Sequence, residues 1–180
     1  MAFSGTIDGP FLMRQYLGLT SSVDSQNGAD APLQFSKRNI ITGATTLTAN
    51  LSGSLCLWNT AAGYTFTLPA PAPGLWFEFL CSITNTSVAC KIVTGTPASQ
   101  FLLGTVHTAV VATTPSSTAG PKAFAFDGTT HVACTMGGSD TTAGGVVGTR
   151  IRVEGISSTV WAITGNIIGS GTIVTPAATS

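Results

Sequence analysis

Short apolar stretches separated by turn-forming residues run through most of this chain, and they constrain its fold more than any other feature. Examples are YTFTL, LWFEFLCSI, CKIV, AFAF, RIRVE and VWAI, and the segments between them are rich in Gly, Pro and Asn. No segment sustains the i, i+3, i+4, i+7 apolar spacing of an amphipathic helix. We therefore predict an all-β fold, with a single β-sandwich or jelly-roll-like core and an irregular N-terminal arm.

The stretch TFTLPAPAPGLWFEFL, residues 65–80, predicts the corner of a sheet rather than a ligand-binding loop. Proline cannot donate a backbone hydrogen bond, so Pro69, Pro71 and Pro73 should end the preceding strand at Leu68 and impose an extended link. Gly74 then permits a sharp turn into the next strand. The residues that follow alternate between two faces, as in a buried strand.

The pattern divides the chain into three parts. Residues 1–43 are polar, rich in Gly, Asn and Asp and without a clear period, which favours an arm that becomes ordered on a partner or an irregular surface strip. Residues 44–174 carry the strand pattern and should form the β-core. Residues 175–180 should be a loose tail.

The chain is unusually poor in charge. Only 8% of its 180 residues are charged and the formal net charge is zero, whereas about 25% is typical. Such a surface offers little attraction to nucleic acid, whose non-specific binding depends on basic residues, and it associates readily with other proteins. A β-domain with a threonine-rich exterior is the alternative interpretation. No apolar run is long enough to span a bilayer, and no secretion signal is visible.

Few residues suggest catalysis. Asp127 and His131, in FDGTTH, are a possible acid–base pair, but the Asp-Gly dipeptide favours a hairpin turn that brings them together without a catalytic purpose. Glu78 could pair with Arg150, Arg152 or Lys91 across the sheet, or face solvent, and either role is favoured over catalysis. The sequence contains no nucleophile elbow, P-loop or zinc-ligand pattern, so we expect a non-enzyme with no cofactor and no metal.

The segment CSITNTSVAC resembles a hairpin with Asn85 and Thr86 at its tip. That register places Cys81 opposite Cys90 as a non-hydrogen-bonded pair, with Cα atoms about 4.5 Å apart, which is just within the range of a disulfide. Reduced, buried thiols are the other possibility, and they are favoured where the protein is not exported. The sequence leaves this alternative open.

The order of these elements resembles a known pattern. The segment TLTANLSGSLCLWNTAAGYTFTLPAPAPGLWFEFLCSI is followed by an apolar strand, by an Asp-Gly turn at residues 126–128, by a strand at residues 147–153 and by a closing strand at residues 161–165. Over roughly residues 45–170 the chain resembles decoration (cement) proteins and fibre-type head proteins of tailed bacteriophages. The pattern contains only turns and apolar positions, so it transfers no catalytic residue.

The resemblance implies a virion protein that is made in the host cytoplasm and binds the outer capsid surface, where it stabilises the shell. Its partners would be the major capsid protein and further copies of itself in a homotrimer, with no nucleic acid and no membrane. The expected capsid contacts are Phe3, Phe11, Leu12, Met13, Arg14, Tyr16, Leu17, Phe35, Lys37 and Arg38.

Two alternative functions compete with this interpretation. One is a tail-fibre or receptor-binding β-module that recognises host glycan through an aromatic platform. Trp58, Trp76 and Trp161 are the candidates for that platform, although their patterns favour the core. The other is a hydrolase that uses Asp127 and His131.

Overall fold

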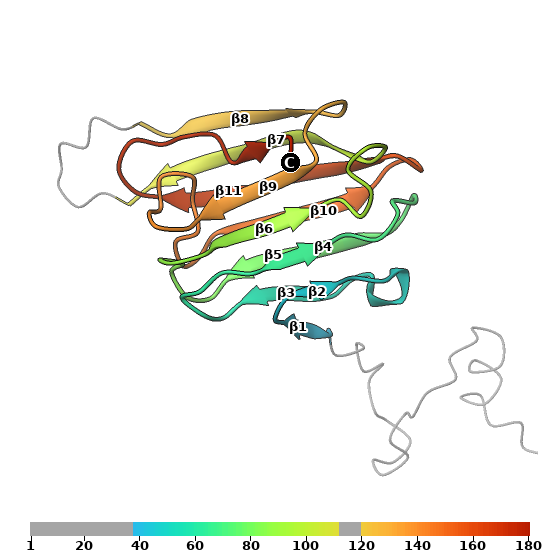
Figure 1. Ribbon diagram of the computed structural model, residues 1–180, viewed down its shortest axis with the longest axis horizontal. Coiled ribbons are helices and arrows are strands. Elements are labelled where there is room, and N and C mark those ends of the chain that lie inside the picture. Colours follow the sequence, from blue (N-terminus) through green and yellow to red (C-terminus); the bar gives the residue numbers. More distant parts are fainter. Residues whose placement is uncertain (1–37, 112–119) are drawn as a thin grey trace, which may run out of the picture. The chain divides into compact units, whose positions relative to one another are not determined.

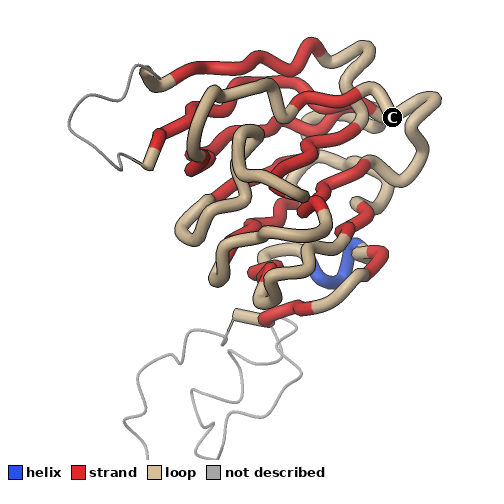
Figure 2. Tube along the Cα trace, turned by 60° about the vertical axis from the view of Figure 1, so that its left-hand side comes forward, coloured by secondary structure: helices blue, strands red, loops and turns tan. Residues whose placement is uncertain are grey.

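The described part of the chain is a β-sandwich of two packed sheets, as predicted (Figure 1). The structure is a computed structural model, and it describes residues 38–111 and 120–180. The seven-stranded sheet contains, in spatial order, β1 (Ile40–Thr42), β3 (Leu55–Trp58), β5 (Trp76–Cys81), β10 (Arg150–Gly155), β11 (Val160–Gly169), β7 (Phe101–Val110) and β8 (Lys122–Asp127). The five-stranded sheet contains β12 (Ala177–Ala178), β9 (Ala133–Gly137), β6 (Ala89–Val93), β4 (Thr65–Thr67) and β2 (Thr45–Thr46). Figure 2 shows the short 3-10 turn η1 (Ala49–Leu51) between β2 and β3. No helix in the described ranges is long and apolar enough to cross a membrane.

The first six strands alternate between the two sheets. β1, β3 and β5 pair in parallel in one sheet, and β2, β4 and β6 pair in parallel in the other. The chain from β1 to β6 therefore winds as a coil, and each turn of the coil contributes one strand to each sheet. β9 and β10 then add antiparallel strands to β6 and β5. A jelly roll is built from antiparallel strands, so the sandwich is the better description of the two that the sequence suggested.

The proline-rich stretch forms the predicted corner between the sheets. β4 ends at Thr67, and Leu68 still donates its backbone N–H to the carbonyl of Val93 at 2.8 Å. The chain then crosses from the five-stranded sheet to β5 of the seven-stranded sheet. Gly74 adopts a φ of 90°, a conformation that side-chain-bearing residues disfavour, and so permits the turn into β5.

The core lies between the sheets and is built from alternating strand residues. In β5, every second side chain from Phe77 to Cys81 is buried. Trp58 and Phe66 lie in different sheets, and their ring centroids are 5.4 Å apart in an edge-to-face arrangement. Phe79 packs against both. Aromatic rings in such geometries stabilise the core beyond the burial of their area, so this cluster fixes the two layers against each other.

Both predicted hairpins are wrong, because each turn joins strands of different sheets. β5 and β6 belong to opposite layers, as do β8 and β9. In the first connection, Asn85 is fully buried instead of lying at an exposed tip. Its side-chain amide donates to the carbonyl of Ala61 at 2.9 Å, and its side-chain oxygen accepts from the N–H of Gly138 at 2.8 Å. These hydrogen bonds join the β5–β6 connection, which contains Asn85, to the β3–β4 and β9–β10 connections at one end of the sandwich.

The limits of the sandwich differ from the predicted ones at both ends. β1 lies within the segment 1–43, yet it pairs with β3, so the sandwich begins before residue 44. β12 lies within the predicted tail 175–180 and pairs with β9. Because β12 contributes only two residues, the composition of the last segment gave little sign of it.

The four cysteines are free and buried. Burial raises the pKa of Cys134 to about 12, and it raises that of Cys56 to about 12 despite the opposing charge of Arg38. The pKa of Cys81 is raised chiefly by a hydrogen bond with Cys90 and also by burial. The structure therefore has Cys81 and Cys90 as neighbouring thiols.

We expect all four thiols of the native protein to resist a disulfide reagent at pH 8, because only an accessible thiolate reacts. The same reagent should label four thiols per chain after unfolding in guanidinium without reductant. Rapid labelling of the native protein, or fewer than four thiols after unfolding, would contradict this arrangement.

Candidate functional site

Five of the nine charged side chains in the described residues gather on the outer face of the seven-stranded sheet. The strand register places Arg152 of β10 beside Glu78 of β5, and Glu154 beside Trp76. Arg150 lies two residues before Arg152 on β10, opposite Leu80 of β5. Alternation predicts that these residues share a face, because their neighbours Phe77, Phe79, Ile151 and Val153 are buried in the core.

Glu78 is the centre of this cluster. Its two carboxylate oxygens accept hydrogen bonds from Arg38 and Arg150, and only 12% of its side chain is exposed. The bond from Arg150 is the largest cause that holds the pKa of Glu78 below its ordinary value, and Arg38 adds to it against the opposing effect of burial. Of the alternatives that the sequence left for Glu78, the structure has the ion pair rather than solvent exposure, with Arg150 as the partner from the three candidates. Lys91 lies in the other sheet, on β6, and takes no part in it.

Arg38 is held by several groups at once. Its Nε donates to the carbonyl of Gly53 at 2.7 Å, and its Nη1 donates to Glu78. Its guanidinium lies over the ring of Trp76, with Cζ 5.0 Å from the ring centroid. Arg152 lies over the same ring at 4.4 Å. The first residue that the structure describes is therefore fastened to the sheet by ionic, hydrogen-bonding and cation–π contacts.

Arg38 is the one predicted capsid contact that lies within the described residues. Its side chain is 33% exposed and turns back onto the sandwich. The other nine predicted capsid contacts, Phe3, Phe11, Leu12, Met13, Arg14, Tyr16, Leu17, Phe35 and Lys37, lie outside the described residues. Sequence reasoning did not find the Arg38–Glu78 pair, since 40 residues separate the two along the chain.

We expect the protein to lose stability in acid as Glu78 becomes protonated. A carboxyl whose pKa is lowered by folding contributes stability above its unfolded pKa, near 4.5, and that stability is lost as the pH falls through the lower folded value. The thermal midpoint should fall between about pH 5 and pH 2, and Glu78→Gln should reduce the slope of that fall.

The partner variant Arg150→Ala provides the matched test. It removes the largest cause of the lowered pKa of Glu78, so the thermal midpoint should also fall less steeply in acid. The double variant Glu78→Gln with Arg150→Ala should have nearly the same slope as either single variant. Asp127 and Asp140 contribute slopes of the same sign, because hydrogen bonds lower the pKa of both carboxyls. If Glu78→Gln kept the wild-type slope of thermal midpoint against pH, the pKa of Glu78 would not differ between the folded and unfolded protein, and the prediction would be wrong.

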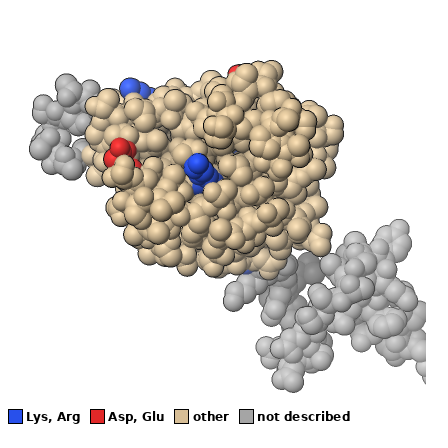
Figure 3. Space-filling model, in the orientation of Figure 1, with Lys and Arg blue, Asp and Glu red and all other residues tan. Residues whose placement is uncertain are grey.

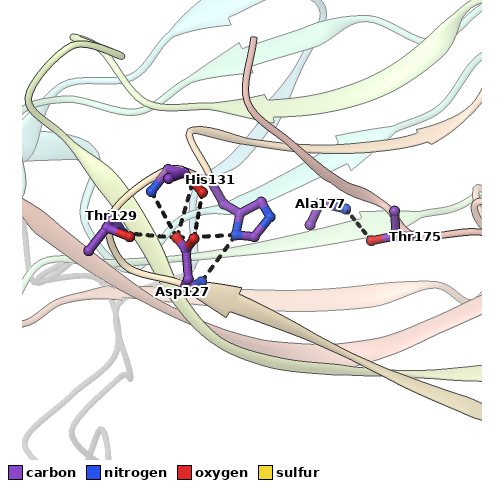
Figure 4. Close-up of polar contacts among 6 residues, drawn as sticks. Asp127, Thr129, His131, Thr175 and Ala177 are labelled. Atoms are coloured by element: carbon purple, nitrogen blue, oxygen red, sulfur yellow. Dashed lines mark hydrogen bonds and ion pairs between the residues drawn. The ribbon is translucent and has the colours of Figure 1, made fainter.

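The loop after β8 is ordered by Asp127 (Figure 4). Its Oδ1 accepts from the backbone N–H groups of Thr129 at 2.9 Å and Thr130 at 2.8 Å, and its Oδ2 accepts from the Thr130 hydroxyl at 2.5 Å. These hydrogen bonds lower the pKa of the carboxyl well below its ordinary range. The aspartate thus shapes a turn, as predicted, although the turn leads to the other sheet.

The pairing of His131 with Asp127 differs from that of a catalytic relay. Nδ1 of His131 accepts the backbone N–H of Asp127 at 3.1 Å. It lies 3.2 Å from the Asp127 carboxylate, but in the neutral ring an Nδ1 that accepts one hydrogen bond cannot also donate another. A relay requires that nitrogen to carry a proton toward the carboxylate. The ring also packs edge-on against Phe126, with centroids 5.7 Å apart.

The three tryptophans separate into two groups. Trp58 and Trp161 are fully buried, as their patterns favoured. Trp76 lies on the outer face of β5 and is partly exposed between its arginine neighbours. The prediction of a core position therefore fails for Trp76, because charged side chains rather than a second sheet cover its ring.

The remaining surface offers little that could hold a metal. No group of three His, Cys, Asp or Glu side chains with suitable placement occurs in residues 38–111 and 120–180. Figure 3 shows one face of the molecule, on which charged side chains are few and widely separated. On the outer side of the five-stranded sheet, Lys91 lies in register between Thr65 and Thr135.

Comparison of the chain with protein-family models, with curated protein sequences and with solved structures gives no match.

Proposed function

We propose that this protein is a decoration protein that binds the outer surface of a phage capsid and stabilises the shell without catalysing a reaction. The observation that carries the proposal is the charge distribution of the sandwich. Its largest charged cluster is internally paired, around Glu78, and much of the remaining surface is neutral. A surface of this kind suits permanent contact with other proteins better than attraction of nucleic acid.

The mechanism that we propose is additional interface. Each copy would bridge neighbouring capsid subunits and bury apolar area, which contributes about 25 cal/mol per Å² before the cost of ordering. The residues that we propose for the contact are those expected from the sequence within residues 1–37. The contacts of Arg38 support this assignment. Arg38 follows the segment directly in the chain, and its side chain is held on the sandwich by Glu78 and Trp76. A contact made by the segment would thereby be connected through Arg38 to the seven-stranded sheet.

The experiment uses DNA-filled heads that lack this protein. Added full-length chain should bind them saturably and raise the temperature at which they release DNA, since contacts that form only on the intact shell stabilise it. Purified tails from the same phage serve as the control and should bind none. Saturable binding to tails together with no change in head stability would refute the proposal.

A second candidate is a glycan-binding module of the tail fibre, and the position of Trp76 favours it. The ring of Trp76 is partly exposed, and a sugar ring could stack on it by displacing the guanidinium of Arg152, which lies over the ring at 4.4 Å. Binding to a glycan array that disappears in Trp76→Ala and persists in Leu103→Ala, an exposed position on β7, would support this function over decoration.

A further inference from the structure

β8 forms one edge of the seven-stranded sheet. It spans six residues and pairs antiparallel with β7, and no other strand in the described ranges pairs with it. Its exposed edge carries backbone groups that a further strand can bind.

The register identifies which backbone groups are free. Gly128 donates its N–H toward β7, to the carbonyl of Leu102, so alternate residues back along the strand also face β7. The N–H of Asp127 faces the other way and is bound by His131. It follows that Ala123 and Ala125 direct their N–H and C=O groups outward from the edge.

Nothing in β8 prevents the approach of another strand. Natural edge strands are protected by proline, by bulges or by charged side chains along the edge. In β8 the two free positions are alanines with exposed side chains, and the register with β7 is continuous. The charges lie only at the ends and are engaged within the chain: Lys122 donates to the carbonyl of Ile173 at 2.9 Å, and Asp127 orders its own turn.

We propose that a second copy of this chain pairs with β8 through its own β8, in an antiparallel arrangement about a two-fold axis at Phe124. Ala123 of each copy then lies opposite Ala125 of the other. The four free N–H and C=O groups of each copy are all used, in four hydrogen bonds across the seam. The bond between Asp127 and His131 is left intact.

This register also covers apolar surface. Phe124 is partly buried and packs against the core from the side of the sandwich. The two-fold axis makes Phe124 and its symmetry mate a non-hydrogen-bonded pair, with Cα atoms about 4.5 Å apart. Aromatic cross-strand pairs stabilise a sheet. A register centred on Ala125 instead needs the N–H of Asp127, which His131 already binds.

The inference is independent of the proposed function. It predicts a two-fold contact, whereas the resemblance implies a homotrimer, so the mass in solution distinguishes the two. The chain has a mass of 18.2 kDa, and the full-length protein at about 100 µM should have twice that mass by light scattering.

Charge variants of the full chain test the register. Glu at both positions (Ala123→Glu with Ala125→Glu), or Lys at both, places like charges opposite each other twice and should weaken self-association at least about tenfold. Lys at position 123 with Glu at position 125 places opposite charges together and should retain the dimer. A mixture of the Glu-Glu and Lys-Lys variants should associate. Since both side chains face solvent, circular dichroism should show all variants folded.

A wild-type mass that stays at 18.2 kDa would overturn the proposal. A trimer, or any oligomer that the Glu-Glu and Lys-Lys variants leave unchanged, would overturn it as well. Weakening by both variants without association of their mixture would show that the edge binds another segment, and would refute the two-fold pairing.

Discussion

Removal of residues 1–37 is expected to reduce binding to capsid shells at least about 100-fold, the loss of roughly 3 kcal/mol of contact energy, and to leave the sandwich folded. All strands in the described part of the chain lie between Ile40 and Ala178, so the truncated chain keeps every strand pair of the two sheets. The truncation ends before Arg38 so that the ion pair between Arg38 and Glu78 on the outer face of the sheet is kept. Removal of residues 1–43 would also delete β1 and confuse the loss of binding with damage to the sheet.

The measurement is co-sedimentation of labelled protein with shells, together with the thermal midpoint of each form. The double variant Phe11→Ala and Tyr16→Ala in the full chain is a milder test of the same segment, and it should lose at least about tenfold in affinity. A truncated form that binds as tightly as the full chain would show that the contact lies on the sandwich.

Replacement of Trp58 by alanine is expected to lower the free energy of unfolding by about 3–5 kcal/mol. Trp58 is fully buried, packs against Phe66 and Phe79, and donates its Nε1 hydrogen to the carbonyl of Tyr64 at 2.8 Å. The substitution leaves a cavity between the sheets and removes one of the two hydrogen bonds that the carbonyl of Tyr64 accepts, the other coming from the backbone N–H of Lys91. Such a loss is a large fraction of the stability of a domain of this size.

Denaturant unfolding of the variant and the wild type measures this effect. Trp76→Ala is the matched control, since Trp76 lies on the outer face with two arginines, and it should cost at most about 2 kcal/mol. Equal losses at the two positions would contradict the assignment of Trp58 to the core and Trp76 to the surface.

Several features of the fold were predictable because they depend on neighbouring residues. The prolines and Gly74 determine the corner between β4 and β5 through their own backbone restrictions. Alternation along β5 and β10 separated the core residues from Glu78 and Arg150, and the charges made Arg150 one of three candidate partners for Glu78. The turn role of Asp127 also followed from its local sequence.

Other features depend on contacts between distant segments. An Asn-Thr or Asp-Gly sequence indicates a turn but not whether the next strand returns to the same sheet, and here it does not. The parallel pairing of β1, β3 and β5 is likewise invisible to alternation, which is the same in parallel and antiparallel strands. The Arg38–Glu78 pair escaped prediction because the register of β1, β3 and β5 brings its members together.

A cryo-microscopy map of phage heads incubated with the full-length protein tests whether the chain binds the outer capsid surface. We expect sandwich-shaped density on the outer surface of the shell, with residues 1–37 in contact with capsid subunits. Heads without added density, with the protein located only on tail fibres, would contradict it.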